Sequence, residues 1–144
     1  MPGFTLSRQA HAPVEEVWKL LFDPTRFPEW WAGVASTRPG ADGGYTLWPE
    51  GWPEFPMPQQ LRSDRAAGRV TVSCQVSSID FVWQLSEADD GGTTISVRVD
   101  LPEAEAHRLD GQRELIARSL RTLASLARRD PQAGRERVPE TPAG

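Results

Sequence analysis

The sequence contains a single cysteine, Cys74, and has no run of apolar residues long enough to cross a membrane. One cysteine cannot form an internal disulfide, which agrees with a reducing compartment. A membrane-spanning helix needs about 18 uninterrupted apolar residues, and a signal peptide needs an apolar stretch where this chain has Arg8 and polar residues. We therefore expect a soluble, cytoplasmic protein without a membrane span.

Metal ligands are also scarce. The two histidines, His11 and His107, lie far apart and have no Cys or His at metal-ligand spacing. We expect no metal and no cofactor, and the catalytic residues stay unknown because no triad can be recognised.

Sixteen Lys and Arg against 20 Asp and Glu give a net charge of −4. Because no global positive field attracts phosphate backbones, the sequence argues against nucleic acid as a partner.

Tryptophan, in contrast, is abundant, with six residues in a chain of 144. That length fits one domain, since domains cluster at about 100–150 residues. Large aromatic side chains are costly to expose and are effective at lining an apolar cavity. The tryptophan content is the first indication of a hydrophobic binding site.

Seven segments have strand patterns, because apolar and polar residues alternate or because strand-forming residues stand between turn residues. We predict strands at residues 4–10, 34–38, 45–48, 59–65, 69–76, 81–88 and 93–101. In the fifth of these, Cys74 and Val76 are expected on the buried face. Asp89 and Asp90 precede two glycines, so we assign them to a hairpin turn and not to a carboxylate pair.

Three helical segments accompany the strands, because apolar residues recur there at helical spacing. We predict a short helix from Pro13 to Phe22, a second one at residues 26–31 capped by Asp23, and a long one from Gly111 to about Arg129. A first turn at residues 103–109 precedes the long helix, with a restart near residues 110–111. Pro, Gly, Arg and Glu dominate residues 130–144, which we predict to be a disordered tail.

A proline-rich segment divides the third predicted strand from the fourth. Residues 49–58 contain four prolines and a glycine, interleaved with Trp52, Phe55 and Met57. Proline cannot donate to a strand ladder, so we expect a long apolar loop that borders the sheet without joining its interior. Loops of this kind are more often functional than ordinary connections.

Two runs carry a resemblance to a known family. Residues 12–21, APVEEVWKLL, and residues 23–31, DPTRFPEWW, together with the order of elements, resemble the START-like, SRPBCC superfamily and within it the polyketide cyclase/dehydrase branch. The resemblance covers about residues 3–129 and implies one α+β domain over residues 1–129. In the helix-grip fold that it implies, a curved seven-stranded antiparallel sheet with two short helices holds a long C-terminal helix. An apolar cavity lies between sheet and helix, but fold alone does not transfer an activity.

We expect this cavity to bind a hydrophobic small molecule such as a lipid, polyketide or quinone, because apolar pockets use aromatics for area and a few polar groups for orientation. The predicted lining residues are Trp30, Trp31, Trp48, Trp52, Phe55, Met57, Leu61, Trp83, Ile116, Leu120 and Arg38. The alternative for the tryptophans is ordinary core packing. Arg8 and Arg38 either face inward and hold a ligand oxyanion or extend to the sheet edge.

Four arginines cluster late in the long helix. Arg118, Arg121, Arg128 and Arg129 stand where cations complement the negative end of the helix dipole, opposite the leucine stripe. From the helix alone we interpret them as a solvated face.

Three functions fit these features. The first is a carrier or sensor of a hydrophobic small molecule. The second is a polyketide cyclase/dehydratase-like enzyme that shapes a flexible substrate in a dry pocket. The third is a protein-interaction module of the chaperone-activator, AHSA type, which an exposed apolar patch over a filled interior favours. We expect a monomer, or a weak homodimer formed through an exposed strand edge.

Overall fold

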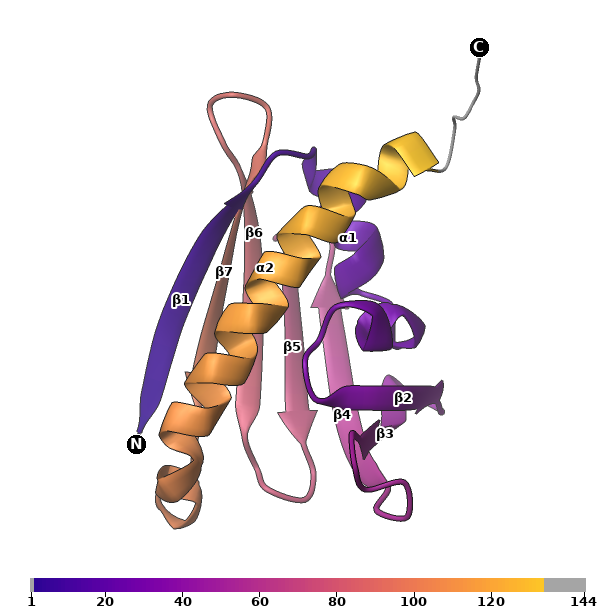
Figure 1. The fold of residues 1–144 in the computed structure, drawn as a ribbon, viewed down its shortest axis with the longest axis vertical. Coiled ribbons are helices and arrows are strands. Elements are labelled where there is room, and N and C mark those ends of the chain that lie inside the picture. The colour runs from indigo at the N-terminus through magenta and orange to yellow at the C-terminus, as the bar shows by residue number, and fades with distance from the viewer. Residues whose placement is uncertain (1, 134–144) are drawn as a thin grey trace.

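Seven antiparallel strands form one sheet in the computed structural model, which describes residues 2–133 (Figure 1). The strands are β1 (Gly3–Ala10), β2 (Val34–Pro39), β3 (Gly44–Pro49), β4 (Met57–Asp64), β5 (Arg69–Cys74), β6 (Asp80–Glu87) and β7 (Thr93–Asp100). Their spatial order is β1-β7-β6-β5-β4-β3-β2, so β1 and β2 are the two edges. The predicted seven-stranded antiparallel sheet is confirmed.

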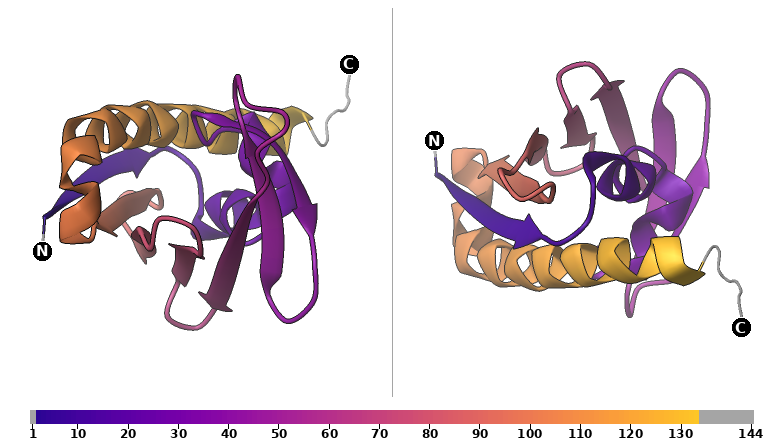
Figure 2. Two further views of the ribbon diagram at one scale, coloured as in Figure 1. Left: turned by 90° about the horizontal axis from the view of Figure 1, so that it is seen from below. Right: turned by 90° about the horizontal axis from the view of Figure 1, so that it is seen from above.

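The long helix α2 (Leu109–Ala133) follows η2 (Glu103–Arg108) and crosses the concave side of the curved sheet (Figures 1 and 2). It docks through residues spaced three and four apart, which gives one apolar stripe. The buried members of the stripe are Ile116, Leu120, Leu123, Ala124 and Ala127. No helix among residues 2–133 has both the length and the apolar character that a bilayer crossing requires.

Both ends of α2 differ from the prediction. The helix begins directly after η2, without a restart at residues 110–111, and its backbone stays helical past residue 129 to Ala133. Helical backbone therefore includes Asp130 and Pro131, which the sequence pattern had indicated as the stop. The rest of the predicted tail, residues 134–144, lies outside the described residues.

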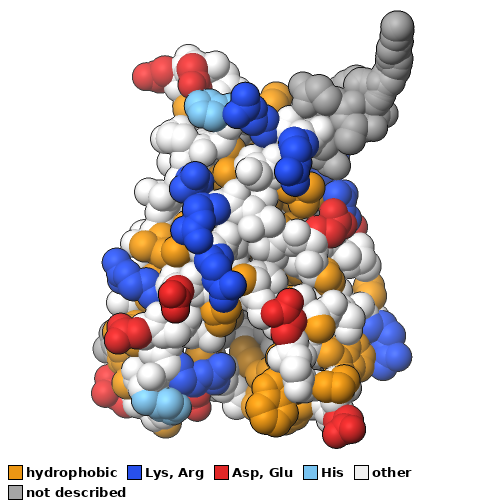
Figure 3. All heavy atoms as spheres, in the orientation of Figure 1, with side chains coloured by type: hydrophobic (Ala, Val, Ile, Leu, Met, Phe, Trp, Pro, Cys, Tyr) orange, Lys and Arg blue, Asp and Glu red, His pale blue; other side chains and the backbone are white. Residues whose placement is uncertain are grey.

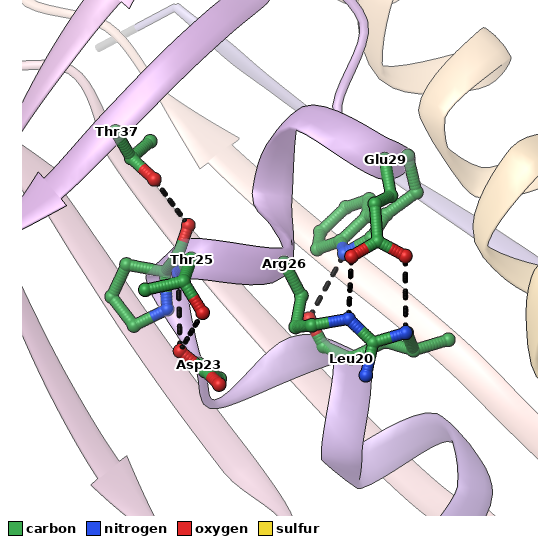
Figure 4. Close-up of polar contacts among 8 residues, drawn as sticks. Leu20, Asp23, Thr25, Arg26, Glu29 and Thr37 are labelled. Carbon is green, nitrogen blue, oxygen red and sulfur yellow. Dashed lines mark hydrogen bonds and ion pairs between the residues drawn. The ribbon is translucent and has the colours of Figure 1, made fainter.

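Two short helical segments connect β1 to β2. They are α1 (Val14–Leu21) and the 3₁₀ segment η1 (Pro24–Glu29). The Asp23 carboxylate accepts hydrogen bonds from the backbone N–H of Thr25, at 3.0 Å, and from its hydroxyl, at 2.7 Å (Figure 4). This is the predicted cap, and it fixes where η1 begins.

A hydrogen bond at each end holds η1 against its neighbours. The hydroxyl of Thr37, on β2, donates to the carbonyl of Pro24 at 2.6 Å, and the indole N–H of Trp30 donates to the carbonyl of Leu20 at 2.9 Å. Between them, Arg26 and Glu29 form an ion pair (Figure 4). The chain that follows η1 is thereby tied to both α1 and β2.

The core is aromatic where η1 meets the sheet. Trp83, on β6, is fully buried, and its ring centroid lies 5.2 Å from that of Trp30 and 5.3 Å from that of Trp31. Trp31 also contacts Phe27 and Phe81, at 5.1 Å each. Tilted and edge-to-face contacts at these distances are favourable beyond the area they bury.

Four further residues differ from the sequence-based expectation. Val76 follows the end of β5 and is 52% exposed, because the chain turns there, with Ser78 at a φ of 62°. Phe22 lies beyond α1 and is 42% exposed. Met57 and Pro58 were expected in a loop outside the sheet interior, but they belong to β4, an interior strand. A proline is tolerated at the start of a strand, because its missing N–H costs only one hydrogen bond of the ladder.

Ser119 connects α2 to the segment between η1 and β2. Its hydroxyl accepts a hydrogen bond from the backbone N–H of Ala32 at 2.9 Å and donates one to the carbonyl of Leu115 at 2.7 Å. The side chain is fully buried. A single hydroxyl thus satisfies a backbone donor 87 residues away in the chain and fixes the approach of the helix.

Replacing Ser119 by alanine leaves the Ala32 N–H without its acceptor. We expect the free energy of unfolding to fall by about 1–3 kcal/mol, the cost of an unsatisfied buried donor. Urea unfolding followed by tryptophan fluorescence measures the change. Ser125→Ala is the matched control, because Ser125 is exposed on the same helix and has the same gain in helix propensity. Equal losses in the two variants would contradict the assigned role.

Candidate ligand pocket

An inner pocket of about 150 Å³ lies between the β3–β6 half of the sheet and the first turns of α2. Segments far apart in the sequence meet there, because the sheet curves toward the helix at this end. The lining residues are Trp31, Ala32, Gly33, Val34, Tyr45, Leu47, Pro49, Met57, Gln59, Cys74, Ser77, Ile79, Phe81, Arg108, Gln112 and Leu115.

A wider vestibule of about 390 Å³ adjoins the inner pocket. It lies against the β3–β4 loop and η2, and it shares four residues with the inner pocket: Pro49, Met57, Ser77 and Arg108. The other vestibule residues are Trp52, Phe55, Val76 and Glu105. Figure 3 shows hydrophobic side chains gathered beside a hollow at this end of the molecule.

Exposed hydrophobic side chains surround the vestibule. Trp52 is 65% exposed and Phe55 is 52% exposed, although both are large and apolar. Large apolar groups gathered at a concave surface mark binding sites more often than isolated ones do. The loop that carries them is short, since only residues 50–56 separate β3 from β4.

Tyr45 is the least satisfied polar residue of the pocket wall. The residue is 3% exposed, and its hydroxyl has no hydrogen-bond partner among the described residues. Burial raises the pKa of Tyr45 above its ordinary value, and the nearby Cys74 raises it further. The phenol therefore keeps its proton, so it remains a hydrogen-bond donor without an acceptor.

Cys74 lies at the end of β5, in the same wall. Burial acts to raise the pKa of the Cys74 thiol, but hydrogen bonds from Ser77, Gln59 and the backbone of Val76 outweigh it and lower the pKa. The amide of Gln59 donates to Sγ at 3.3 Å. Among the described side chains, those of residues 2–129, no group of three or more His, Cys, Asp or Glu is placed to hold a metal ion.

An ion pair stands where the pocket and the vestibule meet. Arg108 contributes to both linings, and its guanidinium lies 2.9 Å from the Glu105 carboxylate, one turn earlier in η2. The two side chains are 38% and 25% exposed, so the pair is partly solvated. Exposed pairs contribute little stability, about 0–1 kcal/mol, and can rearrange when a ligand enters.

Four of the predicted ligand-binding residues lie at these two hollows. Trp31 lines the inner pocket, Trp52 and Phe55 line the vestibule, and Met57 lines both. Four others are buried in the closed core and line neither hollow: Trp30, Trp83, Ile116 and Leu120.

The remaining three predicted residues lie elsewhere on the sheet. Leu61, on β4, is half-buried and packs against the core. Arg38 is exposed on β2, where its guanidinium lies 5.4 Å from the ring centroid of Trp48. Arg38 and Trp48 thus stack on each other at the sheet edge and away from both hollows.

Several pocket residues were missed by the sequence analysis. Cys74 was expected on the buried face of its strand, and Phe81 alternates with buried neighbours on β6, but neither was predicted to line the pocket. Tyr45 and Leu47 are two residues apart on β3, so the same alternation could have placed both on the inner face. Arg108 gave no such signal, because only the three-dimensional path of η2 brings it to the pocket.

This architecture, a curved sheet around a long C-terminal helix with a pocket between them, is the helix-grip fold. The aromatase/cyclase ZhuI from Streptomyces sp. R1128 shares it with a TM-score of 0.73 at 13% identity, over 92% of this chain and 97% of that one. The di-domain ARO/CYC protein BexL, from the BE-7585A biosynthetic pathway, has a TM-score of 0.73 at 14% identity, over 94% of this chain and 48% of that one. A Thermobifida fusca protein has a TM-score of 0.71 at 20% identity, over 88% and 93% of the two chains. Identities this low establish the fold alone.

The sequence also matches a family described as polyketide cyclase / dehydrase and lipid transport, over residues 1–128. The chain belongs to this family, which confirms the resemblance drawn from residues 12–31. A comparison with curated proteins finds no match.

Tyr45 is the only tyrosine, so its ionisation can be followed directly. Because its folded pKa is raised, Tyr45 ionisation does not oppose folding at pH values below about 10, but the free energy of unfolding falls as the pH rises further, since only the unfolded chain readily releases the phenol proton. We expect tyrosinate absorbance to emerge only together with alkaline unfolding. Ultraviolet absorbance and circular dichroism, recorded in parallel against pH, measure both events. Urea-unfolded protein, the control, should titrate near pH 10; a folded protein that does the same would contradict the assignment.

Proposed function

We propose that the protein binds a hydrophobic small molecule as a carrier or sensor, with one end of the ligand in the inner pocket and the rest in the vestibule. The observation that carries this proposal is the pair of adjoining hollows, one lined by Trp31 and Phe81 and the other by Trp52 and Phe55. Apolar walls with a few polar groups are typical of small-molecule sites.

The volumes limit the shape of the ligand. A cavity of about 150 Å³ accommodates a group near the size of benzene, so the inner end is a single ring or a short branched chain. The vestibule, at about 390 Å³, is within the range of about 300–1,000 Å³ found for ligand sites. An elongated molecule with a ring at one end fits both hollows.

Tyr45 supports a ligand that has an acceptor oxygen. A buried hydroxyl without a partner is costly, and a carbonyl or ether oxygen at the inner end of the ligand would accept a hydrogen bond from it. Quinones, flavonoids and aromatic polyketides have such oxygens near a ring, whereas a saturated hydrocarbon does not. The proposal therefore favours oxygenated ring compounds over simple alkyl chains.

A second candidate is a cyclase- or dehydratase-like enzyme. Support comes from the aromatase/cyclase names of two structures with this fold and from the protonated Tyr45 phenol in the pocket wall. A phenol that donates to a substrate carbonyl would polarise it without a triad. Turnover of a bound poly-ketone to a dehydrated ring, detected by mass spectrometry, distinguishes this candidate from a carrier.

The first experiment is a thermal-shift screen with quinones, flavonoids, aromatic polyketides, sterols and fatty acids. A ligand at 100 times its dissociation constant adds about 2.7 kcal/mol of stability. A shift confined to oxygenated ring compounds supports the proposal. A flat response across all classes would instead favour a protein partner that covers Trp52, Phe55 and Val76.

Filling the inner pocket tests its role. Leu47→Trp adds a large side chain to the pocket wall, and we expect it to remove the thermal shift of the best ligand while circular dichroism shows a folded protein. Thr46→Trp is the matched control, because Thr46 is the neighbouring residue of β3 and lies outside the pocket lining. Retained binding in Leu47→Trp would contradict the pocket assignment.

Trimming the vestibule should weaken only long ligands. We expect Trp52→Ala to reduce affinity for an elongated ligand about tenfold, which corresponds to about 1.4 kcal/mol, and to leave a single-ring ligand unaffected. Isothermal titration calorimetry measures both. Trp48→Ala is the control, because Trp48 stacks on Arg38 away from the hollows. Equal losses in both variants would argue against the vestibule.

A further inference from the structure

A third hollow, of about 350 Å³, lies at the other end of α2 from the ligand pocket. It is formed where the end of β1 and the residue after it face the second half of the helix. Arg8 and His11 contribute from the β1 side, and Arg121 and Arg128 contribute from α2. Because it shares no residue with the inner pocket or the vestibule, it is a separate feature of the molecule.

The hollow has a small-residue floor and a basic rim. Arg121 and Arg128 are seven residues apart, so they extend from the same side of α2, two turns from each other. Ala124 lies between them in the sequence, and Ala10 comes from β1; both are buried and too small to fill the space. The three arginines of the lining, Arg8 included, are exposed.

The charges of this groove have no internal counterpart. Its lining contains no Asp or Glu. Four other arginines do have carboxylate partners, in the pairs Arg26–Glu29, Arg65–Glu15, Arg98–Asp100 and Arg108–Glu105. Among the side chains that the structure describes, those of residues 2–129, no ion pair joins Arg8, Arg121 or Arg128 to a carboxylate.

The charge distribution of the whole chain sharpens this contrast. The protein has a net charge of −4, yet residues 115–129 contain four arginines and no acidic residue, and β1 adds Arg8 without an acid. Figure 3 shows basic side chains gathered along this face, away from the hydrophobic end. The helix alone suggested a solvated face; the structure adds Arg8 and His11 from across the groove.

We propose that this β1–α2 groove binds a phosphate-bearing compound. Guanidinium groups form paired hydrogen bonds to phosphate oxygens, and several of them around one hollow suit a group with two or more negative charges. Such an anion relieves the mutual repulsion of Arg8, Arg121 and Arg128. The Ser125 hydroxyl, also in the lining, supplies a further donor.

Inorganic pyrophosphate is the first probe, in titration calorimetry at low and at moderate salt. We expect Arg121→Gln and Arg8→Gln each to weaken binding about tenfold, as expected for the loss of a charge-assisted bond. Arg118→Gln is the matched control, because it makes the same charge change on the same helix outside the groove lining. An equal loss in Arg118→Gln would overturn the proposal, since it would show general attraction by the helix.

Vesicles distinguish the two sources of the phosphate. If the protein sediments with phosphatidylglycerol vesicles but not with phosphatidylcholine vesicles, and Arg121→Gln abolishes this sedimentation, the ligand is a lipid headgroup. Pyrophosphate binding without sedimentation would identify a soluble phosphate compound. If the wild-type protein binds neither probe, the proposal is wrong, whatever the hydrophobic pocket binds.

Discussion

The packing of Trp83 against Trp30 and Trp31 is the contact on which the rest of the structure depends. Trp83 is fully buried in the middle of the sheet, and it holds the chain after η1 against β6. Its indole N–H has no hydrogen-bond partner among the described residues. The stabilisation from buried apolar area and ring contacts in the cluster therefore outweighs the cost of this unsatisfied donor. Trp31 is thereby fixed as a wall, and the space beside it toward α2 stays unfilled.

The Tyr45 hydroxyl is a second unsatisfied donor, but its position differs in kind. Trp83 lies in the closed core, where no ligand arrives, whereas Tyr45 belongs to the pocket wall. Under the proposed function, a ligand oxygen that bonded to the Tyr45 hydroxyl would offset part of the folding cost of burying it. The same wall contains Cys74, whose thiol pKa is lowered by hydrogen bonds from its neighbours although burial acts to raise it.

Alternation of apolar residues, together with strand-forming residues between turns, was enough to predict all seven strands, and the resemblance supplied the fold. It was not enough to decide which aromatic residues meet a ligand. Trp30 and Trp31 are adjacent in the sequence, yet one lies in the core and the other on the pocket wall, because the chain leaves η1 there. Trp48 faces away for a similar reason, since a period of two sends Leu47 inward. Local sequence determines which residues share one face of a strand. Which of those residues line the pocket depends on how far the sheet curves.

Helix α2 contributes to both proposed sites, the pocket through Gln112 and Leu115 and the groove through Arg121 and Arg128. Between them the helix is anchored by its buried apolar stripe and by the Ser119 hydrogen bonds. Coupling between distant sites requires an element with two alternative positions. A helix buried along one face, with a hydroxyl bonded to a fixed backbone donor, has little freedom to shift. The two sites should therefore bind independently, with additive stabilisation when both ligands are present.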